Sequence, residues 1–338
     1  MRCSFLLAVL VTLFGVAGCG GTEGNSTGSE AVTQKAAPSA PEAPLPEVSV
    51  SLDGWEGPAT VGLLIAYQRE FFADEGVAAT ILVSGGGAAL KYVAQGGIEL
   101  AVVHQPQIVT AKDKGAPVVA IGSLVPRATA AMIWKKGSGI EDVSDLRGRT
   151  IAIEGLPFER LFLAQALARG GLTLDDVRVE SVGYELVPAL ASGRADAIFG
   201  GSGNLEGAAL RSRGVKPVVI PLGDLGIPAY DDLVIAARRD HLAADRGLIR
   251  KFMAAVARGT AVAVGDPAAA VAAVEQADER DPKLSAKAIE AEVKATVPLL
   301  ARRASMSAQR TRRLIDWMRA KGMIDRSFPP GGILRSAG

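Results

Sequence analysis

The sequence predicts an α/β protein with two successive sheets and a helical C-terminal tail. Past residue 47, short β-branched runs alternate with longer amphipathic runs, which is typical of βαβ units and a mostly parallel sheet. This alternation pauses near residue 127 and restarts near residue 150, so we expect a second sheet there. From residue 238 to residue 323 the apolar residues follow a helical period.

The order of the expected elements follows from the runs themselves. In the first half the predicted strands are 48–52, 80–84, 98–103 and 118–124, and the predicted helices are 60–72, 88–94 and 107–114. In the second half the predicted strands are 150–153, 177–182, 197–199 and 216–220, and the predicted helices are 159–169, 185–192 and 205–213. Strands and helices therefore alternate in both halves.

Two further strand-like runs, 129–134 and 233–237, lie where the pattern restarts. The simplest topology lets the chain cross from one lobe to the other near residue 127 and return near residue 232. We expect lobe I to hold residues 48–127 and 232–325, with the late helices packed on it, and lobe II to hold 128–231. Ligands of such sheets bind outside the carboxyl ends of the strands, which here means the cleft between the lobes.

The N-terminal nineteen residues predict a lipoprotein signal. Arg2 precedes an apolar run at 5–16 that is too short for a permanent membrane span, and small residues stand before Cys19. We expect residues 1–18 to be removed, Cys19 to carry lipid such as palmitate, and residues 19–47 to form a flexible tether. The mature chain would then be anchored to the cell membrane on its extracytoplasmic side. An ordinary signal peptide with an incidental cysteine is the alternative.

Composition argues against several functions. The formal net charge is +1 with both signs scattered, so the chain shows no footprint for nucleic acid. Cys3 would leave with the signal and Cys19 would be acylated, which leaves no thiolate or disulfide in the mature fold. The two histidines, His104 and His241, are far apart in sequence. We expect no metal site and no cofactor.

Catalytic motifs are few. The glycine cluster at 85–87 continues neither as a P-loop nor as a dinucleotide fingerprint, and the segment around Ser202 fails the nucleophile-elbow pattern at Asn204. Asp231 and Asp232 are adjacent, and neighbours on a strand point to opposite faces, so we expect one in solvent and one facing the cleft. The sequence therefore favours a binding protein over an enzyme.

Polar and aromatic residues recur where the predicted strands end, in both lobes. The glycines at 85–87 allow close backbone approach at a helix N-terminus, and Asn204 or Glu206 could instead serve only their own helix. Because the ends of parallel strands share one edge of a sheet, we expect a ligand-binding site made of these residues: Trp55, Glu56, Ser84, Gly86, His104, Gln105, Glu154, Tyr184, Ser202, Asn204, Glu206 and Tyr230.

Four segments carry a family resemblance. They are FFADEGV at 71–77, GGIELA at 96–101, VSDLRGRTIA at 143–152 and LASGRADA at 190–197. Together they resemble the solute-binding lipoproteins of ABC importers, in the branch for thiamine-pyrimidine precursors, riboflavin-like flavins and alkanesulfonates. The resemblance covers about residues 48–325. It implies a two-lobed type II periplasmic-binding-protein fold that closes by a hinge, acts as a monomer and delivers a small molecule to permease and ATPase subunits.

Two further resemblances indicate that the ligand is a planar heterocycle. NLEG at 204–207 resembles the N-x-E-G segment of the pyrimidine-precursor binders, whose acidic side chain faces the ring, and Trp55 with Pro58 resembles their first strand turn. A related heterocycle such as a flavin fits equally. Three alternatives remain: an alkanesulfonate or taurine binder, a pyridoxal-phosphate-dependent pyrimidine-precursor synthase of the same fold, and a lipoprotein sensor without transport.

Overall fold

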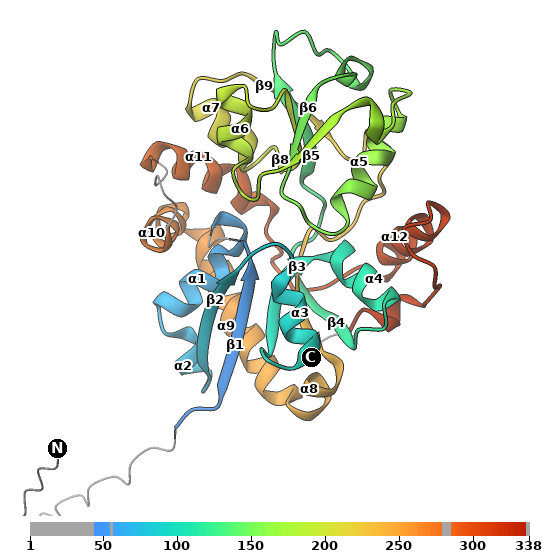
Figure 1. Cartoon of the computed structure of the whole chain (residues 1–338). Helices are drawn as coiled ribbons and strands as arrows, with labels where there is room; N and C mark the ends of the chain where they lie inside the picture. The colour runs from blue at the N-terminus through green and yellow to red at the C-terminus, as the bar shows by residue number, and fades with distance from the viewer. Residues whose placement is uncertain (1–43, 55–56, 279–284, 336–338) are drawn as a thin grey trace, which may run out of the picture. The chain divides into compact units, whose positions relative to one another are not determined.

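The computed structural model describes residues 44–54, 57–278 and 285–335, which belong to one compact unit that begins at Pro44. The predictions for the signal, Cys19 and most of the tether lie outside the described residues, as do those for Trp55 and Glu56. Two five-stranded sheets organise this unit (Figure 1).

The first sheet has the order β2-β1-β3-β10-β4. Its strands β1, β2 and β3 run parallel, and β10 runs antiparallel to both β3 and β4. The bounds are β1 Glu47–Asp53, β2 Ala78–Ser84, β3 Leu100–His104, β4 Val118–Val125 and β10 Leu233–Arg238. The return strand is thus inserted between the strands of the first half, which places its first residues beside the carboxyl end of β3.

The second sheet has the order β7-β6-β8-β5-β9. Strands β6, β7 and β8 are parallel, whereas β5 is antiparallel to β8 and β9. The bounds are β5 Ala130–Lys135, β6 Thr150–Ile153, β7 Arg178–Ser181, β8 Ala197–Ser202 and β9 Pro217–Pro221. The prediction of two mixed sheets followed by helices is therefore confirmed.

Helices fill the connections between strands in both sheets. Beside the first sheet lie η1 Pro58–Thr60, α1 Val61–Gln68, α2 Phe71–Asp74, α3 Ala88–Gln95 and α4 Gln105–Asp113. Beside the second lie η2 Val143–Leu146, α5 Glu159–Ala168, η3 Leu174–Asp176, α6 Leu186–Ser192 and α7 Glu206–Ser212. The single helix expected at 60–72 is broken, because Glu70 adopts a left-handed conformation with φ 57°.

The tail is helical, as predicted. It comprises α8 Arg239–Ala244, α9 Arg246–Gly265, α10 Pro267–Ala277, α11 Ala286–Thr296, η4 Val297–Leu299, α12 Ala308–Ala320 and η5 Pro330–Gly332. Helix α9 packs against α1 and α2 beside the first sheet. However, α11 packs against α7, and the Trp317 ring of α12 meets Phe162 of α5 edge-on at 5.3 Å. The expectation that these helices pack on the first sheet's lobe alone is therefore incomplete.

The residues after α12 cover the edge of β4. All eight residues of β4 are buried, although it is the last strand of its sheet. The Ala120 N–H donates to the Ile333 carbonyl at 2.7 Å, and the Arg335 N–H donates to the Ala120 carbonyl at 2.9 Å. This pairing satisfies part of an edge that would otherwise expose backbone groups.

Candidate ligand-binding site between the two sheets

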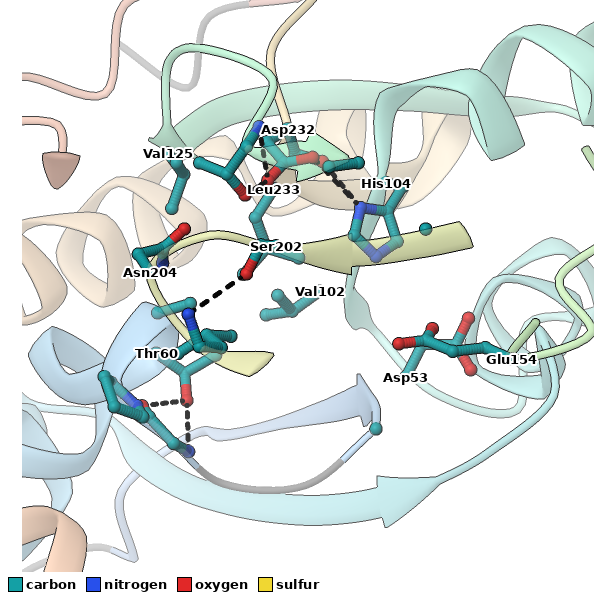
Figure 2. A pocket seen from close by; sticks show the side chains of 18 of the residues that line it. Asp53, Thr60, Val102, His104, Val125, Glu154, Ser202, Asn204, Asp232 and Leu233 are labelled. Atoms are coloured by element: carbon teal, nitrogen blue, oxygen red, sulfur yellow. Dashed lines mark hydrogen bonds and ion pairs between the residues drawn. The ribbon is translucent and has the colours of Figure 1, made fainter. Parts of the chain in front are cut away.

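A pocket of about 120 Å³ lies where the carboxyl ends of strands from both sheets meet. Figure 2 shows its side chains converging from β1, β3, β6, β8 and the return crossing. Its lining consists of Leu52, Asp53, Gly54, Gly57, Pro58, Ala59, Thr60, Val102, His104, Val125, Thr129, Ala130, Glu154, Tyr184, Gly200, Ser202, Asn204, Leu205, Glu206, Asp232 and Leu233.

Asp232, which lines this pocket, joins the two segments that cross between the sheets. Its carboxylate accepts hydrogen bonds from the backbone N–H of Thr129, at 3.3 Å, and from the Thr129 hydroxyl. Its backbone N–H donates to the Val125 carbonyl at 2.9 Å. The outgoing and returning segments are thus joined directly beside the cavity.

His104 stands next to this junction at the end of β3. Its Nδ1 lies 3.0 Å from the Asp232 carbonyl oxygen and 3.5 Å from the Asp232 carboxylate. Figure 2 shows the other ring nitrogen directed toward the side of the pocket where Asp53 and Glu154 lie. His104 can therefore hold Asp232 with one nitrogen and offer the second to a ligand.

The charge of His104 depends on these carboxylates. Burial disfavours the imidazolium, but the interactions with Asp232 and the fields of Glu154 and Asp53 outweigh it and raise the pKa of His104 to about 9. At neutral pH the pocket therefore holds a histidinium that is surrounded by acids.

Glu154 follows β6 and faces the cavity. Burial raises its pKa to about 8, and the neighbouring Glu159 adds to the increase. Burial also raises the pKa of Glu159, although backbone hydrogen bonds from Leu156 and Gly155 oppose that rise. Because Glu159 accepts two such bonds, we infer that the proton shared by this pair resides on Glu154.

Tyr184 brings an aromatic ring from the second sheet to the loops of the first. A Cβ built on Gly54 or on Gly85 would lie 3.5 Å or 3.6 Å from its ring, so the ring packs against bare backbone. Burial raises the pKa of its hydroxyl well above the ordinary value, and the carboxylates of Asp53 and Glu154 add to that shift. Tyr184 therefore brings a neutral phenol to the pocket lining.

Ser202, Asn204 and Glu206 form the end of β8 and the start of α7. The buried Glu206 carboxylate accepts from the Ser202 N–H at 2.5 Å and from the Ser202 hydroxyl at 3.1 Å. Burial raises the pKa of Glu206, and these bonds oppose the rise. The Asn204 amide donates to the Thr296 hydroxyl at the end of α11, at 2.9 Å.

The structure places six of the predicted residues on the lining: His104, Glu154, Tyr184, Ser202, Asn204 and Glu206. Four other predicted residues are not on it: Ser84, Gly86, Gln105 and Tyr230. Ser84 bonds to the Ser51 hydroxyl at 2.9 Å, and Gly86 is exposed outside the lining. Tyr230 is 1% exposed and packs edge-on against Phe162 in the core.

Gln105 and Asp231 belong to a buried network instead. The Gln105 amide nitrogen donates to the Thr311 hydroxyl at 2.9 Å, and its oxygen accepts from the Asp231 N–H at 3.0 Å. The Asp231 carboxylate is fully buried and pairs with Arg310 of α12 at 2.7 Å. The expectation that one acid of the 231–232 pair is solvated is therefore wrong, because a cation from the distant tail reaches it.

Several pocket residues were not foreseen. Asp53, Thr60 and Thr129 line the cavity, and Glu159 lies just behind it, beside Gly200. Asp53 and Thr129 do stand at strand boundaries, which is the signal that could have identified them. Glu159 carries no such signal, because it is already inside the next helix.

Within the described part of the chain, no group of three or more His, Cys, Asp or Glu is placed to hold a metal ion. Among the helices described, none has the length and hydropathy needed to cross a bilayer.

The fold places this chain among proteins with the α/β periplasmic-binding-protein architecture. It superposes on the alkanesulfonate-binding protein SsuA of Xanthomonas axonopodis pv. citri, solved with bound MOPS, with a TM-score of 0.68 and 18% identity, covering 87% of this chain and all of that one. A Candida albicans protein with the generic periplasmic-binding-protein fold superposes with a TM-score of 0.63 and 15% identity, covering 86% of this chain and 97% of that one. At these identities the likeness concerns the fold alone.

The profile of the NMT1/THI5-like family matches residues 58–270, and the chain belongs to this family. A Haemophilus influenzae relative named for thiamine biosynthesis is 26% identical over 284 residues, which cover 83% of this chain and 89% of the relative. The formylaminopyrimidine-binding protein of Halalkalibacterium halodurans is 28% identical over 224 residues, which cover 66% and 68%. The riboflavin-binding protein RibY of Chloroflexus aurantiacus is 27% identical over 244 residues, which cover 70% and 69%.

The family also contains enzymes. A 4-amino-5-hydroxymethyl-2-methylpyrimidine phosphate synthase of Aspergillus parasiticus is 27% identical over 231 residues, which cover 65% of this chain and 67% of that enzyme. Family membership therefore does not by itself separate a binder from a synthase.

Proposed function

We propose that this protein is the solute-binding component of an ABC importer and that it captures a small aminopyrimidine of the thiamine-precursor type in the pocket between the two sheets. The observation that carries the proposal is the composition of that pocket. Four carboxyl groups and one histidine line it, and no lysine or arginine is among its described lining residues. Such a lining suits a ligand that donates hydrogen bonds and bears no negative charge.

The hydrogen-bonding groups of an aminopyrimidine complement those of the pocket. Its amino group can donate to a carboxylate such as Glu206 or Asp53, and its ring nitrogens can accept from the His104 Nε2–H or from the protonated Glu154. Tyr184 offers an aromatic face for stacking. Trp55, predicted as a ligand-binding residue, stands in sequence between the lining residues Gly54 and Gly57.

The size of the pocket favours one ring over three. A cavity of roughly 150 Å³ holds a benzene molecule, and this pocket measures about 120 Å³. A substituted pyrimidine exceeds that space by a few substituent atoms, whereas a tricyclic flavin exceeds it by two further rings. This supports the pyrimidine relatives over the riboflavin relative as guides to the ligand.

The pocket does not fit pyridoxal phosphate, the cofactor implied by the synthase alternative. That cofactor forms an imine with a lysine amine, and no lysine is among the described lining residues. Its phosphate also needs positive charge or free backbone N–H groups, and the acids that line this pocket outnumber its one cation, His104. We therefore propose binding without chemistry.

The ligand is tested by calorimetric titration of the purified protein. We expect formylaminopyrimidine or 4-amino-5-hydroxymethyl-2-methylpyrimidine to bind at least about a hundredfold more tightly than riboflavin or taurine, a difference of about 2.8 kcal/mol. Equal or tighter binding of taurine or riboflavin would reject the proposed ligand class. Retention of pyridoxal phosphate through purification, seen by absorbance, would favour the synthase instead.

Delivery and anchoring are part of the same proposal. We propose that Cys19 carries the lipid that holds the protein on the extracytoplasmic side of the membrane, beside its permease, and that one monomer carries one ligand. Metabolic labelling with a fatty acid should mark the wild type and not Cys19→Ala. Uptake of labelled pyrimidine should fall when the gene is deleted; an unchanged uptake would favour the sensor alternative.

A further inference from the structure

The buried side chain of Glu159 accepts hydrogen bonds from the loop that precedes its own helix, α5. Its Oε2 accepts from the backbone N–H of Gly155 at 2.6 Å and from that of Leu156 at 2.7 Å. Only 1% of the residue is exposed. The two N–H groups thus converge on one carboxylate oxygen at the N-terminus of α5.

Asp53 has the same relation to α3. Its Oδ1 accepts from the N–H of Gly87, the residue that caps this helix, at 2.9 Å. Its Oδ2 accepts from the side-chain amide of Gln107 at 2.7 Å. One N–H of the glycine loop that we expected to approach a ligand is therefore already engaged by a side chain from β1.

Convergent backbone N–H groups at the start of a helix are the usual protein partners of sulfate, phosphate and sulfonate oxygens. Here Glu159 occupies the N–H groups of Gly155 and Leu156, and Asp53 occupies that of Gly87. Asp53 carries a negative charge, and so does the pair formed by Glu159 and Glu154. In a space of low dielectric, such a charge repels a second anion. The neighbouring carboxylate of Glu206 adds to that repulsion.

A glycine leaves the space that the Glu159 side chain occupies. A Cβ on Gly200, a residue of the pocket lining, would lie 2.4 Å from the Glu159 carboxylate, so only glycine leaves space for it. A glutamine could satisfy the same N–H groups through its amide oxygen without burying a carboxyl group. The use of an acid at this buried position therefore calls for a role beyond capping.

We propose that Glu159, together with Asp53, is a built-in counter-anion that excludes sulfonate, sulfate and phosphate groups from the pocket and thereby determines its specificity. This inference rests on the proposed function only in taking the same pocket as the ligand site. It assigns to Glu159 a role in rejecting ligands, without contact with the accepted one.

The test measures whether substitutions of Glu159 increase the affinity for anions. Ethanesulfonate and inorganic phosphate are titrated into wild type, Glu159→Gln and Glu159→Ala at constant ionic strength. Glu159→Gln removes the charge and keeps the shape, and Glu159→Ala also frees the two N–H groups. We expect anion affinity to rise in the order wild type, Gln, Ala, with a gain of about tenfold or more in Glu159→Ala, because one nearby like charge is removed.

Glu185→Gln is the matched control. Glu185 also stands at the start of a helix beside the second sheet, but it is exposed and makes no capping bond with its side chain. It should leave anion affinity at the wild-type value. Melting curves show which variants are folded, and if Glu159→Ala does not fold, Glu159→Gln decides.

One result would overturn the inference: folded Glu159 variants bind ethanesulfonate and phosphate no better than wild type does. That outcome does not depend on the heterocycle, because the probes are simple anions. If the pyrimidines fail to bind wild type while the variants gain anion binding, the proposed ligand is wrong and the role of Glu159 stands.

Discussion

Two tyrosines show how residue type alone underdetermines function. Both were predicted to belong to the ligand-binding site. Tyr184 lines the pocket and rests against Gly54, whereas Tyr230 is 1% exposed and packs against Phe162. Their local sequences do not differ in a way that reveals this, because the difference lies in which neighbours the fold supplies.

Substitution should separate these two tyrosines. Tyr184→Ala should weaken ligand binding by about tenfold, since stacking and area burial contribute at least about 1.4 kcal/mol, with a small change in stability. Tyr230→Ala should cost about 3 kcal/mol or more in stability because it leaves a cavity in the core. Calorimetric titration and chemical unfolding of both variants measure this. A reversed pattern would contradict the pocket geometry.

The buried acids and His104 predict how stability changes with pH. Raising a carboxyl pKa from 4.5 to about 8, as for Glu154, means that the folded state holds its proton longer, so stability falls as the pH rises from 4.5 to 8. Raising the His104 pKa from 6.5 to about 9 adds stability that is complete below pH 6.5 and is lost as the pH rises through 9. Both effects have the same sign.

We therefore expect the melting temperature of the ligand-free protein to fall between pH 5 and pH 9. His104→Gln should flatten the part above pH 6.5, and Glu154→Gln should flatten the part below pH 8. Melting by circular dichroism in buffers of constant ionic strength gives the three curves. A melting temperature that rises steadily over this range would contradict the assigned protonation states.

At the scale of elements, α1 and the tail helix α9 pack at very short range. A Cβ on Gly259 of α9 would lie 1.9 Å from the Gly62 carbonyl oxygen of α1, and one on Gly62 would lie 2.1 Å from the Thr260 hydroxyl. The two backbones touch because neither residue has a side chain. This contact fixes α9 beside the helix that follows the pocket residue Thr60.

Gly259→Ala should therefore separate these helices. We expect a loss of about 1–3 kcal/mol from overpacking, which lowers the melting temperature by at least about 2 °C for a chain of this size. Gly265→Ala, at the end of the same helix with open space around it, should cause no loss, since alanine is the better helix former. Equal melting temperatures for the two variants would refute this packing argument.

At the scale of the whole described unit, two kinds of connection join the sheets. One is the pair of crossings, held together by Thr129 and Asp232. The other is the tail, which binds the second sheet's helices through the Asn204–Thr296 hydrogen bond and the Trp317–Phe162 ring pair. We propose that the crossings act as the hinge of closure and that the tail contacts form and break with it.

Ligand-induced closure has a direct measurement. The radius of gyration from solution scattering should decrease slightly when a tight ligand is added, because hinge closure draws the two sheets together over the pocket. The same ligand should cause no decrease in Tyr184→Ala at a concentration that leaves this variant unbound. An unchanged profile for saturated wild type would count against a hinge.

Much of the fold could be predicted because periodicity is a local property. The β-branched runs of β3 and β6 and the amphipathic spacing of the late helices are set by residues a few positions apart. The break in the helix at Glu70 was missed, since the sequence around it still reads as helical. For the pocket, strand ends predicted His104 and Glu154 on its lining, and their contact with a ligand stays a prediction.

The sequence by itself determined the two sheets, the helical tail and the gathering of polar residues at strand ends, because these follow from the spacing of neighbouring residues. Only the tertiary structure decided which polar groups are already occupied. Gln105 is engaged by Asp231 across 126 positions, and Arg310 reaches that same acid across 79. Whether a side chain is free for a ligand depends on such distant partners, and no local pattern encodes them.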